Sequence, residues 1–193
     1  MSLYKNNYTL FRSENELKLV DKTYPLNKKE CSVCGDTGQV ELHDAPAIML
    51  SCIDFRLRDN VSCHLDVMGY QNKYDEVIAA GASLGYNDFL DYKGWDLFLD
   101  QHIQISYNLH KIHEIIIIDH MHCGAYNVQY NNGKQLPDDK EYNLHVINLR
   151  KAYKTLFKRF NPYNGTVLKI PNLKIKLYIL SIDACRLTPI SPK

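Results

Sequence analysis

The stretch that decides the fold is Ile115-Ile116-Ile117-Ile118, which is apolar and β-branched at every position. β-branched side chains favour the extended backbone of a strand. A strand that is apolar on both faces is typical of the centre of a parallel sheet with helices packed on each side. We therefore expect a central, buried strand here, which ends two residues later at His120.

Apolar runs and helical periodicities lie on both sides of this strand along the chain. Three more strands are predicted, at 47–51, 75–79 and 173–182. Apolar residues at helical spacing predict helices at 59–68, 95–109 and 141–160, and the polar stretch 127–139 is predicted to be an insertion. The apolar face expected for the second helix comprises Trp95, Phe98, Leu99, His102, Ile103, Ser106 and Leu109. Strands that alternate with helices predict an α/β fold with a central, mainly parallel sheet of about four strands, flanked by helices.

The first 44 residues differ from the rest of the chain. They are polar and carry no strand signal, and we expect one helix at 9–21 and a loop at 24–44. We therefore predict an N-terminal polar arm at 1–44 and one α/β domain at 45–193. The chain of 193 residues, 45% of them hydrophobic, is sufficient for one packed core.

Charge and hydropathy exclude several classes of partner. The formal net charge of +1 is too small for an electrostatic footprint on nucleic acid or on an anionic membrane. The first ten residues are polar, no signal-peptide core follows them, and no apolar stretch approaches the roughly 18 residues of a membrane span. We therefore expect a cytoplasmic protein with no membrane and no nucleic-acid partner. Six cysteines in such a protein indicate metal or redox chemistry before disulfides.

Two cysteines and one histidine lie just after predicted strands. Cys52 follows the strand at 47–51, His120 follows the central strand, and Cys123 comes three residues later. Sites in open α/β sheets form outside the carboxyl ends of the strands, so these side chains are expected to converge. Two Cys and one His are the ligands of a zinc site that keeps its fourth position open. The alternative is that both cysteines are small buried apolar side chains and His120 is a hydrogen-bonded core histidine.

A carboxylate and a guanidinium stand beside the first of these cysteines. Asp54 and Arg56 are separated by one residue, and in an extended segment they would point to the same side, within reach of a bidentate pair. Such a pair keeps the carboxylate ionised and oriented, so it can accept a hydrogen bond from a water on a nearby metal. The alternative is an ordinary surface salt bridge.

The two motifs together, C-x-D-x-R at 52–56 and H-x-x-C-G at 120–124, resemble the β-class carbonic anhydrase family, and the resemblance extends roughly over 47–182. It implies a β-carbonic-anhydrase-like zinc domain at 45–193 and a homodimer or a higher homo-oligomer, with the polar arm packed on a partner subunit.

The resemblance also implies a chemistry, that of a zinc lyase of the carbonate dehydratase type. One Zn²⁺ per chain would be bound by Cys52, His120 and Cys123, with the catalytic pair Asp54 and Arg56 beside it. The implied reaction is the reversible hydration of carbon dioxide to bicarbonate and a proton, in which hydroxide generated by zinc attacks carbon dioxide and the Asp–Arg pair orients it.

Several positions depart from the family pattern. Ile78 and Ala79 replace the usual Arg and Asn, Phe55 stands where many members have Ser, and His122 stands where Asp or Glu is common. The departures keep two other hypotheses open: a zinc hydrolase of another small electrophile, such as carbonyl sulfide or carbon disulfide, and a non-catalytic zinc-binding or scaffold protein. His122 is a candidate proton shuttle, with a histidine that is hydrogen-bonded to the backbone as the alternative.

Two further cysteine patterns have weaker interpretations. The C-x5-R spacing from Cys52 to Arg58 occurs in cysteine-dependent phosphatases, but this loop lacks glycine, and Asp54 would repel a phosphate. Cys31 and Cys34 resemble half of a zinc knuckle, with free thiols in a loop as the alternative. Residues that could complete such a second metal site are His43, Cys63 and His64.

Overall fold

The computed structural model describes residues 44–87, 89–91, 93–161 and 169–193. The chain divides into two units, Met1–Glu41 and Leu42–Lys193, and the fold given below is that of the second unit. The predicted helix at 9–21 and the pair Cys31 and Cys34 lie outside the described residues, as does the polar arm apart from Asp44, so these stay predictions.

A five-stranded sheet forms the centre of the described unit, with strand order β2-β1-β3-β4-β5. The strands are β1 (Ala47–Ser51), β2 (Tyr74–Ile78), β3 (Glu114–His120), β4 (Lys174–Leu180) and β5 (Leu187–Pro189). β1 to β4 are parallel and β5 is antiparallel to β4. The four predicted strands are therefore confirmed. β5 was not predicted, because three residues that include a proline carry no usable periodicity.

The isoleucine run is the central strand, as predicted. β3 pairs with β1 on one side and β4 on the other, and all seven of its residues are buried. Its side chains alternate between the two faces: Ile115 and Ile117 belong to one core cluster, and Ile116 and Ile118 belong to the other. This alternation is the period of two that strand geometry imposes.

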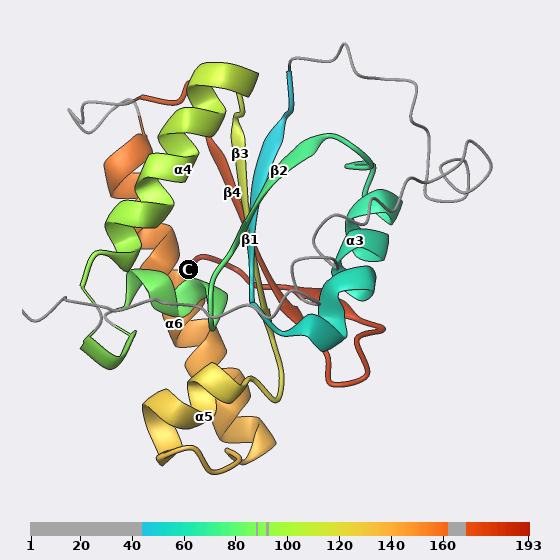
Figure 1. Cartoon of the computed structure of the whole chain (residues 1–193), viewed down its shortest axis with the longest axis vertical. Helices are drawn as coiled ribbons and strands as arrows, with labels where there is room; N and C mark the ends of the chain where they lie inside the picture. The colour runs from blue at the N-terminus through green and yellow to red at the C-terminus, as the bar shows by residue number, and fades with distance from the viewer. Residues whose placement is uncertain (1–43, 88, 92, 162–168) are drawn as a thin grey trace, which may run out of the picture. The chain divides into compact units, whose positions relative to one another are not determined.

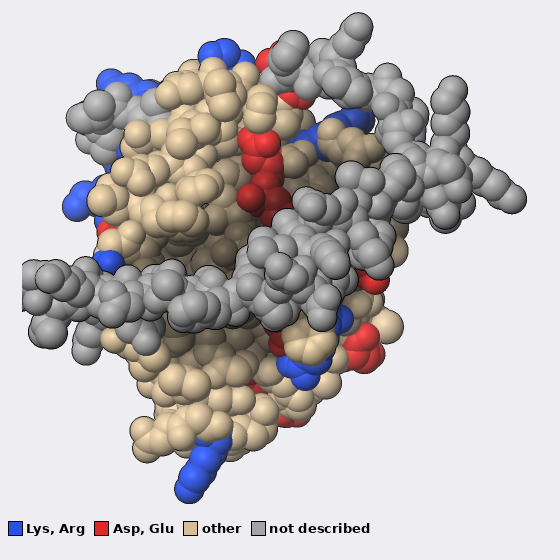
Figure 2. All heavy atoms as spheres, viewed as in Figure 1, with Lys and Arg blue, Asp and Glu red and all other residues tan. Residues whose placement is uncertain are grey.

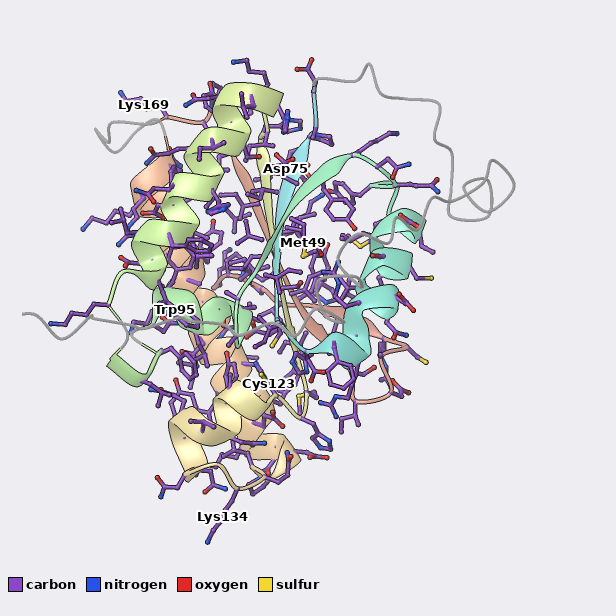
Figure 3. The ribbon with its side chains drawn as sticks, viewed as in Figure 1. Met49, Asp75, Trp95, Cys123, Lys134 and Lys169 are labelled. Carbon is purple, nitrogen blue, oxygen red and sulfur yellow. The ribbon has the colours of Figure 1, made fainter. Side chains whose placement is uncertain are left out.

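Helices cover both faces of the sheet (Figure 1). The helices are α3 (Arg58–Val67), α4 (Trp95–His110), α5 (Gly124–Asn131) and α6 (Asp138–Phe160), with short 3₁₀ turns η1 (Phe55–Leu57), η2 (Ala82–Tyr86) and η3 (Phe89–Asp91). On one face α3 contributes Val61 and Leu65, which cluster with Met49 of β1, labelled in Figure 3. On the other face α4 and α6 pack against the residues of the isoleucine run that point their way. The predicted helices at 59–68, 95–109 and 141–160 are confirmed.

The structure corrects the predicted insertion at 127–139 and the predicted apolar face of the helix at 95–109. The stretch 127–139, predicted to be a polar insertion, begins inside α5, and its polar side chains serve the fold: Asn127 accepts the Leu136 backbone N–H at 2.9 Å. In α4 the buried side chains are Leu99, Asp100, Ile103 and Ser106, whereas Phe98 and Leu109, predicted on the apolar face, are 47% and 61% exposed. Periodicity alone therefore placed that face slightly wrong. Among the described residues, no helix is both long and apolar enough to span a membrane.

Candidate metal centre

Three potential ligands converge at the carboxyl-terminal edge of the sheet. Cys52 follows β1, His120 ends the neighbouring strand β3, and Cys123 precedes α5. β1 and β3 are parallel and in register, with Ser51 opposite Ile118, so both strands deliver their next residues to the same edge. The two Sγ atoms are 3.9 Å apart, and the two sulfurs and one His120 ring nitrogen all lie within 4.8 Å of one another. The group could therefore hold a metal ion. Cys123 is labelled in Figure 3, between the sheet and α5.

The ring of His120 is prepared for a ligand bond. Its Nδ1 lies 2.9 Å from the Met121 carbonyl oxygen, and because a carbonyl only accepts, Nδ1 carries the proton. Its Nε2 is buried and has no hydrogen-bond partner among the residues that the structure describes. An unpartnered buried nitrogen costs about 1–3 kcal/mol, which a metal–nitrogen bond would remove. This argues against a core histidine whose hydrogen bonds are all satisfied.

The two thiols influence each other strongly. The hydrogen bond with Cys123 lowers the pKa of the Cys52 thiol, and the Gly81 N–H, 3.3 Å from the Cys52 sulfur, acts in the same direction. The pKa of Cys123 is raised by the hydrogen bond to Cys52 and by burial. Two thiolates this close repel each other in a buried site, so full ionisation of the pair requires a cation between them. The donor set thus fits a metal ion that prefers sulfur and nitrogen.

Gly81 supports Cys52 and was not predicted as a site residue. Its φ of +68° lies in the left-handed region, and a Cβ atom there would come within 2.6 Å of the Leu84 side chain. Glycine avoids both costs, so the backbone can present its N–H to the Cys52 sulfur. Just before it, Ile78 and Ala79 help to line an apolar hollow of about 440 Å³.

Asp54 and Arg56 form the predicted bidentate pair. Arg56 Nε donates to Asp54 Oδ1 at 2.9 Å, and Arg56 Nη2 donates to Oδ2 at 2.5 Å. The expected extended backbone was wrong: Asp54 is the N-cap of η1 and also accepts the Arg56 backbone N–H at 3.1 Å, so a tight turn brings the two side chains together. The hydrogen bond from the Arg56 side chain is the main reason why the pKa of Asp54 falls to about 2. The carboxylate stays ionised over the whole neutral range.

An open hollow of about 620 Å³ lies against these residues. Cys52, Asp54 and Arg56 line it together with His122. The rest of its wall is apolar or small, from Ile53, Phe55, Ala80, Phe89, Gly124, Ala125 and Val128. A small uncharged molecule could therefore reach the sulfur and carboxylate groups along an apolar surface.

His122 lies between the two ligands of the H-x-x-C motif, and its φ of +59° is unusual for a residue with a side chain. Its Nε2 lies 2.9 Å from an Asp138 carboxylate oxygen, and its backbone N–H donates to Glu141. The ligand atoms of His122, Asp138 and Glu141 lie close enough that this group could also hold a metal ion. The Glu141 oxygens, however, already accept the backbone N–H groups of His122 and Cys123, so we assign no metal to it.

The remaining cysteine hypotheses gain no support. Arg58 donates from both Nη atoms to Glu76 at 2.6 and 3.1 Å, so it is not available to a phosphate beside Cys52. Cys63 is an exposed thiol, and His64 Nε2 lies 3.0 Å from a backbone carbonyl oxygen.

Sequence reasoning missed a set of buried polar residues behind the turn between His120 and Cys123. Glu141 accepts the Cys123 N–H, and further side chains link it to β3. One signal was available: Glu141 and His145 fall on the same helical stripe as Leu149 and Ala152, so titratable side chains occupy the face of α6 that packs on the sheet. The set comprises Ser83, Asp119, Tyr126, Glu141 and His145.

Comparison with known proteins shows relatives without an assigned function. No family model matches the chain. An uncharacterized protein of Rickettsia conorii is 30% identical over 143 residues, which is 74% of this chain and 70% of that protein. An uncharacterized protein of Rickettsia bellii is 30% identical over 142 residues, which is 74% of this chain and 80% of that protein.

Solved structures similar to this chain are carbonic anhydrases. CafA, a β-carbonic anhydrase of Aspergillus fumigatus, matches with a TM-score of 0.57 at 12% identity, over 86% of this chain and 81% of that one. Tetrameric β-carbonic anhydrases of Sordaria macrospora give 0.54 at 13% identity, over 77% and 82%. A carbonic anhydrase of Glaciozyma antarctica gives 0.52 at 16% identity, over 89% and 98%. The chain therefore has the β-carbonic anhydrase fold, as the motifs predicted, and it belongs to one family with the uncharacterized Rickettsia proteins.

Proposed function

We propose that this protein is a zinc lyase that catalyses the reversible hydration of carbon dioxide to bicarbonate and a proton. One zinc ion per chain would be bound by Cys52, His120 and Cys123. The observation that carries the proposal is the buried Nε2 of His120, which has no hydrogen-bond partner in the described part of the chain and lies within 4.8 Å of the sulfur atoms of Cys52 and Cys123. A zinc ion bound there would supply Lewis acidity and lower the pKa of a water in its fourth position toward ~7.

Asp54 orients the attacking water in this proposal. Its Oδ2 lies 3.9 Å from His120 Nε2, and the depressed pKa of the carboxyl group keeps it a hydrogen-bond acceptor at every physiological pH. An ionised acceptor at that place would accept a hydrogen bond from the water and so hold it in one orientation. Arg56 donates to both carboxylate oxygens, which restricts the rotation of Asp54 and competes with a metal ion for its oxygens.

The hollow beside these groups supports a small apolar substrate. Carbon dioxide carries no net charge and no dipole, and the wall formed by Phe55, Ala125 and Val128 offers it an apolar approach. Hydrolysis of carbonyl sulfide or carbon disulfide is the second candidate. It is favoured by Ile78 and Ala79, which line an apolar hollow where the family has Arg and Asn.

We also propose a homodimer or a higher homo-oligomer in the cytoplasm. Ile53 and Phe55, beside the candidate site, are 60% and 84% exposed. In Figure 2 the surface over α4 carries few charged side chains. Apolar side chains exposed on these two elements include Ile78, Leu97, Phe98, Ile105 and Leu109, and a large exposed apolar surface favours association. A ligand set with two thiolates needs reduced cysteines, which supports the cytoplasm as its compartment.

Stopped-flow measurement of carbon dioxide hydration at pH 8.5, on protein with a measured zinc content, tests the proposal. A rate well above that of the buffer is expected. A zinc-loaded protein with no such rate would eliminate the first candidate, and release of hydrogen sulfide from carbonyl sulfide or carbon disulfide would then identify the second. A zinc-loaded protein inactive in all three assays would be a non-catalytic zinc-binding protein.

A further inference from the structure

Three buried titratable side chains link the two ligand-bearing segments from behind. Asp119 on β3 and Glu141 and His145 on α6 are all buried. His145 Nδ1 lies 2.9 Å from Asp119 Oδ2, and its Nε2 lies 3.6 Å from Glu141 Oε1. Asp119 is the residue before His120, and Glu141 is bound to the backbone of Cys123. The three side chains therefore connect one end of the H-x-x-C segment to the other.

Asp119 anchors the end of β3. Its carboxylate accepts the Ser83 backbone N–H at 3.0 Å, the Ser83 hydroxyl at 2.7 Å and the Tyr126 hydroxyl at 2.7 Å. Ser83 lies in η2 and Tyr126 in α5, so the Asp119 carboxylate connects the carboxyl-terminal end of β3 to two neighbouring elements. Buried networks whose groups are well paired are rigid, which restricts the position of His120.

Glu141 anchors the turn that carries the second cysteine. Its Oε2 accepts the His122 N–H at 3.0 Å and its Oε1 accepts the Cys123 N–H at 2.8 Å. The turn needs this support because the positive φ of His122 is an unfavourable backbone conformation for a residue with a side chain. The His122 N–H takes part in no helix, so the Glu141 carboxylate supplies its acceptor. With both amide groups held, the direction of the Cys123 Cα–Cβ bond is defined.

His145 joins the two anchors. It lies one helical turn after Glu141, the spacing at which side chains of a helix meet. Its ring packs against the Tyr126 ring with the centroids 3.7 Å apart. The two carboxylates that it separates would otherwise face each other without a cation in a buried space.

We propose that Glu141, His145 and Asp119 are positioning residues of the metal centre, which hold His120 and Cys123 in place for the same ion. This rests on the proposed metal site. Residues that hydrogen-bond to metal ligands from behind fix the orientation of those ligands. Their substitution typically lowers metal affinity about 10–100-fold.

Glu141→Gln is the sharpest variant. The amide of Gln has one oxygen and one NH₂ group, so only one of the two backbone N–H groups keeps an acceptor and the other faces a donor. Glu114→Gln is the matched control. Glu114 is also buried, begins the same strand that His120 ends, and is hydrogen-bonded to Tyr70 and Lys176 away from the candidate centre.

The experiment measures metal affinity and stability separately. Metal-free wild type, Glu141→Gln, His145→Gln and Glu114→Gln are titrated with Co²⁺, followed through the thiolate charge-transfer band, and with Zn²⁺ in competition with a chelator. Denaturant unfolding of the same metal-free samples gives their stabilities. Glu141→Gln is expected to bind Zn²⁺ about 10–100-fold more weakly and to show an altered cobalt band. Glu114→Gln is expected to lose stability but to keep the wild-type affinity and band.

Two results with the variants would overturn the inference. One is wild-type affinity and spectrum in Glu141→Gln, and another is an equal loss of affinity in Glu114→Gln, which would mean that general destabilisation weakens binding. Should Glu141→Gln fail to fold, His145→Gln carries the same expectation and the same contrary result. A wild-type protein that binds neither Co²⁺ nor Zn²⁺ would overturn the proposed metal site as well, so the two failures are distinguishable.

Discussion

The Nε2 atom of His120 and the Oδ2 atom of Asp54 lie 3.9 Å apart. This distance is too long for a hydrogen bond between the two groups. The lone pair of His120 Nε2 and a lone pair of Asp54 Oδ2 are therefore not used by each other. The carboxylate is turned to this place by its bidentate contact with Arg56, and the imidazole by its contact with the Met121 carbonyl oxygen. A potential ligand atom and an oriented hydrogen-bond acceptor are thus held side by side at the edge of the sheet.

Removal of one thiol should abolish metal binding. Cys123→Ser is expected to leave the purified protein with well under one zinc per chain, because a neutral hydroxyl is a poor ligand in place of a thiolate. Cys63→Ser is the control, since Cys63 is exposed and does not belong to the group Cys52, His120 and Cys123 that could hold a metal ion. Metal analysis of the purified proteins gives the answer, and a wild-type protein without zinc would contradict the metal site itself.

Asp54→Asn should separate activity from metal content. The amide cannot act as the ionised acceptor, so the kcat/KM of carbon dioxide hydration is expected to fall about 100-fold or more. Zinc content should stay at the wild-type level because Asp54 is not one of the three ligands. Asp59→Asn on the exposed side of α3 serves as the control. Full activity in Asp54→Asn, or loss of its zinc, would refute the role given to Asp54.

Replacing Arg56 by Lys should weaken the orientation of Asp54. A lysine ammonium cannot hold both carboxylate oxygens in one plane, and the loss of one charge-assisted hydrogen bond of about 1.5–3 kcal/mol corresponds to a fall of about tenfold or more in kcat/KM. Arg58→Lys is a matched control, because Arg58 makes the same bidentate contact with Glu76. Equal activities of the two variants would show that the Asp54–Arg56 geometry does not matter.

Gly81→Ala should destabilise the fold and disturb Cys52. The new Cβ meets the Leu84 side chain at 2.6 Å in a backbone with positive φ, so we expect a loss of about 1–3 kcal/mol in unfolding free energy. Gly133→Ala also places alanine at positive φ, +81°, but its Cβ would meet no atom of the described residues within 4 Å. Denaturant unfolding of both variants isolates the steric part, and equal losses would contradict it.

The stability of the protein should depend on pH through His145. Burial lowers the pKa of His145, but its hydrogen bond with Asp119 and the negative charges of the Asp119 and Glu141 carboxylates outweigh this and raise the pKa above its ordinary value. The native state therefore holds a proton that the unfolded state releases, so this stabilisation is full below pH 6.5 and is lost as pH rises through the raised pKa. Above pH 6.5, and until the raised pKa is passed, the metal-free wild type should lose up to about 1.4 kcal/mol per pH unit relative to His145→Gln. Parallel stability curves would contradict this.

Local sequence was sufficient for most of the fold. The isoleucine run predicts a strand because β-branched residues are confined to extended backbone, and its lack of polar positions predicts burial on both faces. Parallel strands end at one edge, so the convergence of Cys52 and His120 also follows from their places in the sequence.

What the sequence by itself determined is which segments form buried strands and which ligand types end up at their carboxyl ends, since both depend on the residues of one segment. Only the tertiary structure decided which buried polar groups meet. The Gly81 N–H that reaches the Cys52 sulfur, the contact of His145 with Asp119 and the hydrogen bond from Cys123 N–H to Glu141 each join two different elements of the fold. A buried charge is stable only beside its partner, and that partner is chosen by the packing of helix on sheet.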